Sequence, residues 1–336
     1  MRIIFNRLIS VIPNIFGVII VTFIIVRILP GDPAIFFAGP LASDEAIEKI
    51  KIEMNLDKNL FQQLIIYITE LFQGNLGNSL TTGQPVLIDL IKRLPASLEL
   101  TLCSLIFSFI ISIPVGIYSA IKKDTLFDHI VRATVTIVAA LPTFFVALLL
   151  VFTLYYVFPI ASAPFGRLNL FADPPEFFTG FYLIDSLIIG DFNLWYASFS
   201  HLILPSISLG LFAVAPLTRM IRASMIEILS NDFIIAAKSY GLSTYKVIII
   251  YAFKNVLISL LNTFGMIFSF LLGASVLVEK VYSWPGIGTY AVKAVLTSDY
   301  ASVQGFVLVI AILYVILNLF IDVISKLFDP RISYTN

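Results

Sequence analysis

The chain has 336 residues, of which 59% are hydrophobic and only 12% are charged. Soluble domains carry about 25% charged residues, so the composition indicates an integral membrane protein. The net charge is zero, which excludes the basic surface of a nucleic-acid-binding protein. The single cysteine, Cys103, excludes an internal disulfide and a metal site built from several thiolates.

Six apolar segments are long enough to cross the hydrocarbon core of a membrane, which takes about 20 helical residues. The first is followed by Arg27 and lacks a small-residue cleavage site, so we interpret it as an uncleaved span. The fourth is the weakest, because Pro205, Gly210 and Pro216 loosen a helix. The sequence thus predicts an all-α integral membrane protein with six transmembrane helices, at 8–26, 100–121, 133–158, 202–218, 255–278 and 300–321.

The positive charges give the direction of the spans, because short cytoplasmic loops carry an excess of Lys and Arg. With the N-terminus inside, the short outer loops contain only Arg167, Lys280 and Lys293. We therefore expect both termini to be cytoplasmic. The inner segments then contain Arg2, Arg7, Lys122, Lys123, Arg132, Arg219, Arg222, Lys238, Lys246, Lys254, Lys326 and Arg331.

The ends of these spans divide the chain into four parts. We expect a first transmembrane helix at 1–30, followed by a sizeable external loop or subdomain at 31–98. A transmembrane domain of five helices follows at 99–326, with a cytoplasmic loop at 219–255 and a cytoplasmic tail at 327–336. In the external part, Ser43 opens a charged helix with Asp44 and Glu45 in its first turn, and a more apolar helix follows at 59–72.

A second external feature is the sequence SWPGIG in the outer loop at 279–299. Trp284 suits the membrane interface. Pro285 and Gly286, with Gly288 just beyond, predict a structural turn.

The cytoplasmic loop has an unusual pattern at 231–255, where two short helices flank Gly241. Asn231 or Ser230 can cap the first helix, with Asp232 at its positive end. Gly241 and Leu242 follow that helix, and the glycine is placed to end it in a left-handed conformation. Ser243 can then cap the second helix.

One face of the first short helix is formed by Phe233, Ala236, Ala237 and Tyr240, which recur at helical spacing. The small side chains of Ala236 and Ala237 permit a partner to approach the backbone closely. The residues alone leave two readings equally open, a surface for another protein and a short helix lying on lipid headgroups.

The segment Ala236-Ala237-Lys238-Ser239-Tyr240-Gly241 resembles the cytoplasmic "EAA" loop of binding-protein-dependent ABC importer permeases. Ile235 stands where that motif has Glu, and Lys254 where many members have Pro. Both departures resemble the dipeptide, oligopeptide and nickel branch of the family, above all the first membrane subunit of dipeptide permeases. The resemblance covers nearly the whole chain, through motifs at 30–33, 74–80, 112–116, 203–205, 219–225, 283–288, 299–300, 303–305 and 329–331.

The resemblance implies an ABC importer type I permease fold and import of dipeptides or oligopeptides across a bacterial cytoplasmic (inner) membrane. It also implies four protein partners besides lipid: a second homologous permease, two ABC ATPases and an extracytoplasmic substrate-binding protein. The chain would be no enzyme and would bind no cofactor, since the ATPases use ATP and Mg. The coupling loop that docks on an ATPase would comprise Asp232, Ala236, Ala237, Gly241, Leu242 and Ser243.

Several alternatives stay open. Nickel and haem importers share the subfamily, so the substrate is not fixed, and neither are the residues that line its path. An ion-coupled secondary transporter or a membrane scaffold would be rivals from other classes. His129 and His201 lack neighbouring ligands, so we expect no metal site. A glycine-rich external tip, either a receptor-docking segment or a lid on the outer spans, contains Gly74, Leu76, Gly77, Ser79 and Leu80.

Overall fold

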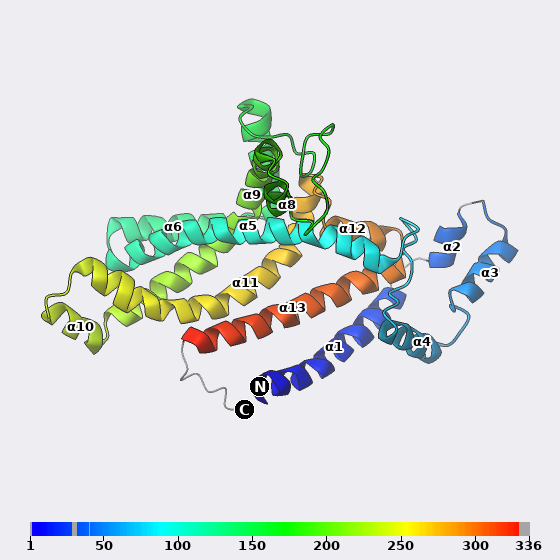
Figure 1. The fold of residues 1–336 in the computed structure, drawn as a ribbon, viewed down its shortest axis with the longest axis horizontal. Coiled ribbons are helices and arrows are strands. Elements are labelled where there is room, and N and C mark those ends of the chain that lie inside the picture. Colours follow the sequence, from blue (N-terminus) through cyan, green and yellow to red (C-terminus); the bar gives the residue numbers. More distant parts are fainter. Residues whose placement is uncertain (1, 29–31, 40, 329–336) are drawn as a thin grey trace. The chain divides into compact units, whose positions relative to one another are not determined.

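The fold is given by a computed structural model that describes residues 2–28, 32–39 and 41–328 (Figure 1). Helices dominate it, and within those ranges no strand forms beyond an isolated bridge between Asn78 and Pro85. The chain divides into two compact units. One comprises residues 1–95 and 285–319, and the other residues 96–284 and 320–336.

The first unit contains α1 (Arg2–Ile28), α2 (Pro33–Ala38), α3 (Asp44–Glu53), α4 (Leu60–Phe72), the start of α5 (Val86–Ile121), α12 (Ile287–Leu296) and most of α13 (Tyr300–Phe328). Side-chain caps fix where the three short helices α2, α3 and α4 begin. Asp32, Ser43 and Asn59 each accept a backbone N–H in the first turn of α2, α3 and α4. The cap predicted at Ser43 and the helix predicted at 59–72 are therefore confirmed.

The core of this unit lies where α5, α12 and α13 meet. Val86, Leu90, Ile287 and Tyr290 are buried there, and Leu76 packs against them. Gly305 of α13 permits this packing, because a Cβ at its position would lie 2.5 Å from Cγ1 of Val86.

The second unit is built around α9 (Phe192–Leu229), which packs against α11 (Lys254–Val281), α7 (Thr143–Leu150), α6 (Leu126–Ala140) and α8 (Tyr182–Ile188). Small residues let α9 approach α5 closely, as is typical of membrane helices. The hydroxyls of Ser108 and Ser112 donate to the carbonyls of Gly210 and Val214, over 2.7 and 3.2 Å. The remaining elements are η1 (Val151–Val157), α10 (Asp232–Ser239) and η2 (Lys246–Phe253), of which η1 and η2 are π-helical.

Among the described residues, four helices are long and apolar enough to cross a membrane: Val86–Ile121, Phe192–Leu229, Ser259–Val281 and Tyr300–Ser325. The segment predicted to be the weakest lies inside the 38-residue α9, which continues through Pro205 and Pro216. About three quarters of its most apolar stretch (72%) is buried in the protein, so neighbouring helices stabilise what the composition alone makes weak.

The span predicted at 133–158 is not one continuous helix. Helices α6 and α7–η1 meet there at 97°. The break lies at Leu141, whose extended backbone (ψ 130°) follows from Pro142, because the residue before a proline disfavours the helical region. The two arms together still form one candidate crossing.

Candidate functional site

The loop between α9 and α11 folds as the sequence predicts at its first helix. α10 begins at Asp232 and is followed by Gly241, whose φ is +78°. The N–H of Gly241 donates to the carbonyl of Lys238 and the N–H of Leu242 to that of Ala237, over 3.0 and 3.3 Å. These two bonds define the Schellman ending of a helix, so the prediction for Gly241 is confirmed.

Two details of the loop differ from the prediction. Asn231 occupies the N-cap position of α10 with an extended backbone, but its side chain makes no capping hydrogen bond. Ser243 does accept the N–H of Lys246, over 3.5 Å. The second helix is not short, because η2 runs directly into the 28-residue α11.

The outward face of α10 carries three of the four residues predicted to share it. Phe233, Ala236 and Tyr240 are exposed, whereas Ala237 is buried together with Ile234. The prediction was wrong for Ala237, because α10 packs on the rest of the unit through residues 234 and 237. Asp232, Gly241 and Ser243 are also exposed, and Leu242 is half-buried.

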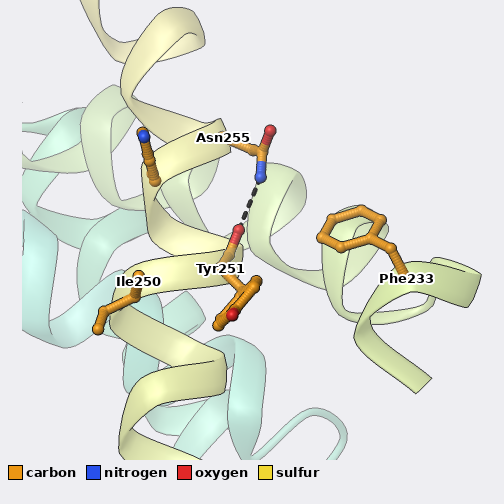
Figure 2. Close-up of a pocket in the computed structure, with 5 residues that line it drawn as sticks. Phe233, Ile250, Tyr251 and Asn255 are labelled. Atoms are coloured by element: carbon orange, nitrogen blue, oxygen red, sulfur yellow. Dashed lines mark hydrogen bonds between the residues drawn. The ribbon is translucent and has the colours of Figure 1, made fainter. Parts of the chain in front are cut away.

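A hollow of about 450 Å³ lies beside this face, and we call it the loop groove. It is lined by Phe233 of α10, by Ile250 and Tyr251 of η2, and by Lys254 and Asn255 at the start of α11 (Figure 2). The Asn255 amide donates to the carbonyl of Tyr251 over 2.6 Å, which fixes one wall. The groove thus combines aromatic walls with one cation, a surface suited to binding another protein.

An ion pair at the base of this loop was missed by the sequence reading. Asp128, at the start of α6, is fully buried. Its carboxylate accepts hydrogen bonds from Nε and Nη2 of Arg222, each over 2.6 Å. The hydroxyl of Ser119 and the N–H of Asp124 also donate to Asp128. The pair joins α9 to the first turn of α6, so Arg222 has a structural role besides its positive charge.

A second buried pair lies at the other end of the unit. Glu99 of α5 accepts Nη2 of Arg167 over 2.5 Å and the N–H of Leu183 over 2.9 Å. Arg167 also donates to the carbonyl of Gly180 and lies 3.4 Å above the ring of Tyr182. The segment containing α8 is therefore held to α5 by charge, hydrogen bonding and stacking together.

The turn predicted at 284–288 is present, but the role expected for Trp284 is wrong. Trp284 is only 1% exposed, and its indole N–H donates to the carbonyl of Ala96 over 2.9 Å. It therefore anchors the end of α11 to α5 instead of lying at a membrane interface. α11 ends at Val281, Gly286 caps α12 with an extended backbone, and Gly288 lies in the first turn of α12.

The external glycine-rich tip is partly anchored within its own unit. Gly74 is exposed, whereas Leu76 packs on the core and a Cβ on Gly77 would lie 3.0 Å from Ala301. The hydroxyl of Ser79 and the N–H of Leu80 both donate to Asp299, each over 2.8 Å. A docking role for this tip remains a prediction.

The histidines do not come together. His201 is buried beside Asn169, and His129 is exposed on α6. Across the ranges that the structure describes, no three His, Cys, Asp or Glu residues gather in a way that could hold a metal ion.

Two family models match this chain over nearly its whole length. Residues 112–334 match the family described as binding-protein-dependent transport system inner membrane component. Residues 1–101 match the N-terminal part of the membrane components of such systems.

Curated relatives cover the chain almost from end to end. It is 38% identical to the probable D,D-dipeptide transport system permease protein of Escherichia coli (strain K12), over 94% of this chain and 93% of that one. It is 37% identical to the dipeptide transport system permease protein of Alkalihalophilus pseudofirmus, over 98% of each chain. The dipeptide transport system permease protein of Escherichia coli (strain K12) is 34% identical over 99% of each chain. The resemblance drawn from the motifs is thereby confirmed, and the chain belongs to the family of binding-protein-dependent transport system inner membrane components, as a multi-pass protein of the bacterial inner membrane.

Proposed function

We propose that the chain is one of two membrane subunits of an ATP-driven importer of dipeptides or oligopeptides. The relatives named as dipeptide permeases support the substrate class, and no observation favours nickel or haem. The other components would be a second homologous permease, two ABC ATPases and an extracytoplasmic binding protein. ATP and Mg would be bound by the ATPases.

The proposed topology has six crossings, with both termini in the cytoplasm. The four long apolar helices and the bent pair α6 with α7–η1 supply five. α1 supplies the sixth, because its 27 residues extend about 40 Å, more than the roughly 30 Å of the hydrocarbon core. The Lys and Arg of the short loops then lie inside.

The loop 231–255 is proposed to dock on one ATPase subunit. The observation that carries this proposal is an apolar surface at the loop that the described part of the chain does not cover. Tyr240 and Tyr245 are 87% and 71% exposed, and Phe233 and Tyr251 beside them line the loop groove. Exposed apolar patches of this kind mark protein-binding surfaces.

The two ends of the loop explain how docking would move the spans. α9 enters it and α11 leaves it, and between them the helices are interrupted by short turns at Ser230–Asn231 and around Gly241. A displacement of α10 by a closing ATPase dimer would shift both helices together, as coupled switching requires a rigid connection between two discrete states.

Two substitutions test the docking surface in the reconstituted importer. Phe233→Asp places a charge on the apolar face, so we expect the ATPases to be lost on size-exclusion chromatography and peptide uptake into proteoliposomes to stop. Phe171→Ser is the matched control, because Phe171 is 99% exposed in a segment far from the loop in sequence. Normal assembly and uptake with Phe233→Asp would refute the docking role.

The turn at Gly241 is tested separately. Gly241→Val forces a β-branched residue into φ > 0, whereas Gly241→Asn keeps a residue that tolerates this region. We expect Val, and not Asn, to abolish uptake. Normal import by Gly241→Val would refute the role of this turn. If Gly241→Val alone abolishes uptake but the substrate taken up is nickel or haem instead of peptide, then the substrate class fails and the coupling proposal stands.

A further inference from the structure

α4 packs against α1 in a register that runs antiparallel. Gln63 accepts a hydrogen bond from Nε of Arg27 over 2.8 Å, Tyr67 stacks on Phe23 at 5.9 Å, and Phe72 lies 6.4 Å from Phe16 between ring centroids. Residue numbers rise along α4 as they fall along α1. α4 therefore follows α1 from Arg27 back toward the middle of that helix.

This register places α4 at membrane depth if α1 is the first span, so the inference rests on the proposed topology. Arg27 marks the outer end of the apolar stretch of α1. Phe16 lies eleven residues before it, which corresponds to about 16 Å along a helix. That distance is roughly half of the hydrocarbon core, so the end of α4 at Phe72 would reach well into the outer leaflet.

The centre of the exposed side of α4 is an apolar stripe. Phe61, Ile65, Ile68 and Phe72 recur at i, i+4, i+7 and i+11 and so share one narrow stripe of the helix. Phe61 is 71% exposed and Phe72 79% exposed, and Ile65 is exposed between them. In water such a stripe would have to be covered.

The polar side chains of α4 are divided, with Gln63 and Glu70 opposite the stripe and Gln62 and Thr69 exposed beside it. Gln63 is buried and bonds Arg27 and the carbonyl of Lys58, and half-buried Glu70 projects from the same side of the helix. Thr69 lies beside the stripe, but its hydroxyl donates to the carbonyl of Ile65 over 2.8 Å, which satisfies it within the helix. A helix that faces water would expose its glutamine and glutamate and bury its phenylalanines, whereas α4 exposes Phe61 and Phe72 and turns Gln63 and Glu70 away from the stripe.

We propose that α4 is embedded in the outer leaflet and that its stripe contacts the acyl chains of lipids. The stripe continues the lipid-facing side of α1, where Phe16, Ile20 and Ile24 are also exposed. The segment between α1 and α5 is then divided, with α3 in water and α4 in the membrane.

Cysteine accessibility tests this placement in intact cells carrying the complete importer. Phe61→Cys, Ile65→Cys and Phe72→Cys are made with Cys103→Ser, and modification by a membrane-impermeant maleimide is read on the affinity-purified chain. A thiol surrounded by lipid stays protonated and unreactive, so we expect labelling at least about tenfold slower than at Glu48→Cys on exposed α3. Rapid labelling of the stripe would overturn the proposal.

Two further readouts separate lipid from protein and this inference from the topology. A phospholipid with a photoreactive acyl chain should form adducts on peptide 59–73 and none on 43–53. A protein interface would give a different result: labelling would be slow, no lipid adducts would form, and labelling would become rapid when the partner permease or the binding protein is deleted. That result would overturn the proposal. Ile24→Cys on α1 tests the span itself. If this cysteine is labelled rapidly, the proposed topology fails. If it stays unlabelled while the stripe cysteines of α4 are labelled rapidly, only the placement of α4 is refuted.

Discussion

Removing the positive partner of the buried pair Glu99–Arg167 should destabilise the protein strongly. The side chains of Arg167 and Glu99 are only 6% and 4% exposed, so water cannot replace the missing partner. In Arg167→Met the apolar stem is kept, but the Glu99 carboxylate retains only the N–H of Leu183. Breaking a buried pair in this way costs about 3–5 kcal/mol.

The double variant Glu99→Gln/Arg167→Met separates the cost of an unpaired charge from the value of the pair. Gln keeps an oxygen that can accept the N–H of Leu183 and carries no charge. Replacement of a complete buried pair is often close to neutral, so we expect the double variant to recover about 2–3 kcal/mol relative to Arg167→Met.

The assay is the thermal unfolding midpoint of the assembled importer in lipid nanodiscs. At roughly 2–4 °C per kcal/mol, Arg167→Met should lower the midpoint by about 10 °C, and the double variant should regain about half of that loss. Lys51→Met is the control. It breaks an ion pair with Asp32 that is largely exposed (42% and 29%), so the midpoint should change little. Equal midpoints for Arg167→Met and the double variant would refute the reasoning.

Three further predictions concern close packing and a buried hydroxyl. Gly210→Ala would place a Cβ 2.6 Å from the carbonyl oxygen of Ser104, so we expect a loss of about 1–3 kcal/mol in the same unfolding assay. Gly273→Ala, with no atom within 4 Å of the added Cβ, should leave the midpoint unchanged or higher, and a fall equal to that of Gly210→Ala would contradict the packing argument. Tyr282→Phe removes a 2.8 Å hydrogen bond to Ser208 and should cost about 1 kcal/mol. Burial raises the pKa of Tyr282 to about 12. Below a pH of about 10, the usual tyrosine pKa, this tyrosine should therefore stabilise the fold fully. Its contribution should be lost as the pH rises toward the raised pKa. A parent protein that loses no more stability than Tyr282→Phe between pH 9 and 11 would contradict it.

Features governed by local rules were readable from the sequence. Gly241 follows a short helix and takes φ > 0, and Ser43 caps α3 with Asp44 and Glu45 behind it. The break at Pro142 was equally readable, because a proline restricts the residue before it. It was overlooked because the apolar run from 133 to 158 is uninterrupted in hydropathy.

Features that depend on distant partners were not readable. Arg167 is separated from Glu99 by 68 residues and Arg222 from Asp128 by 94. The composition gives no way to pair these residues, because each arginine is equally well explained as one of the positive charges of the loops. The face of α10 shows the same limit: helical spacing groups Ala236 with Ala237, but only packing decides that Ala237 turns inward.

The buried pair Asp128–Arg222 and the serine bonds to α9 bear on how the proposed docking of the loop 231–255 would act on the spans. α9 runs through 38 residues, about 57 Å, and ends at the loop. Near that end Arg222 fixes it to the first turn of α6, and farther along the carbonyls of Gly210 and Val214 receive the serine hydroxyls of α5. A displacement of α10 therefore cannot be absorbed by bending of α9 alone, since α5 and α6 are bonded to the same helix. These contacts favour a unit that moves as one body when the loop is displaced.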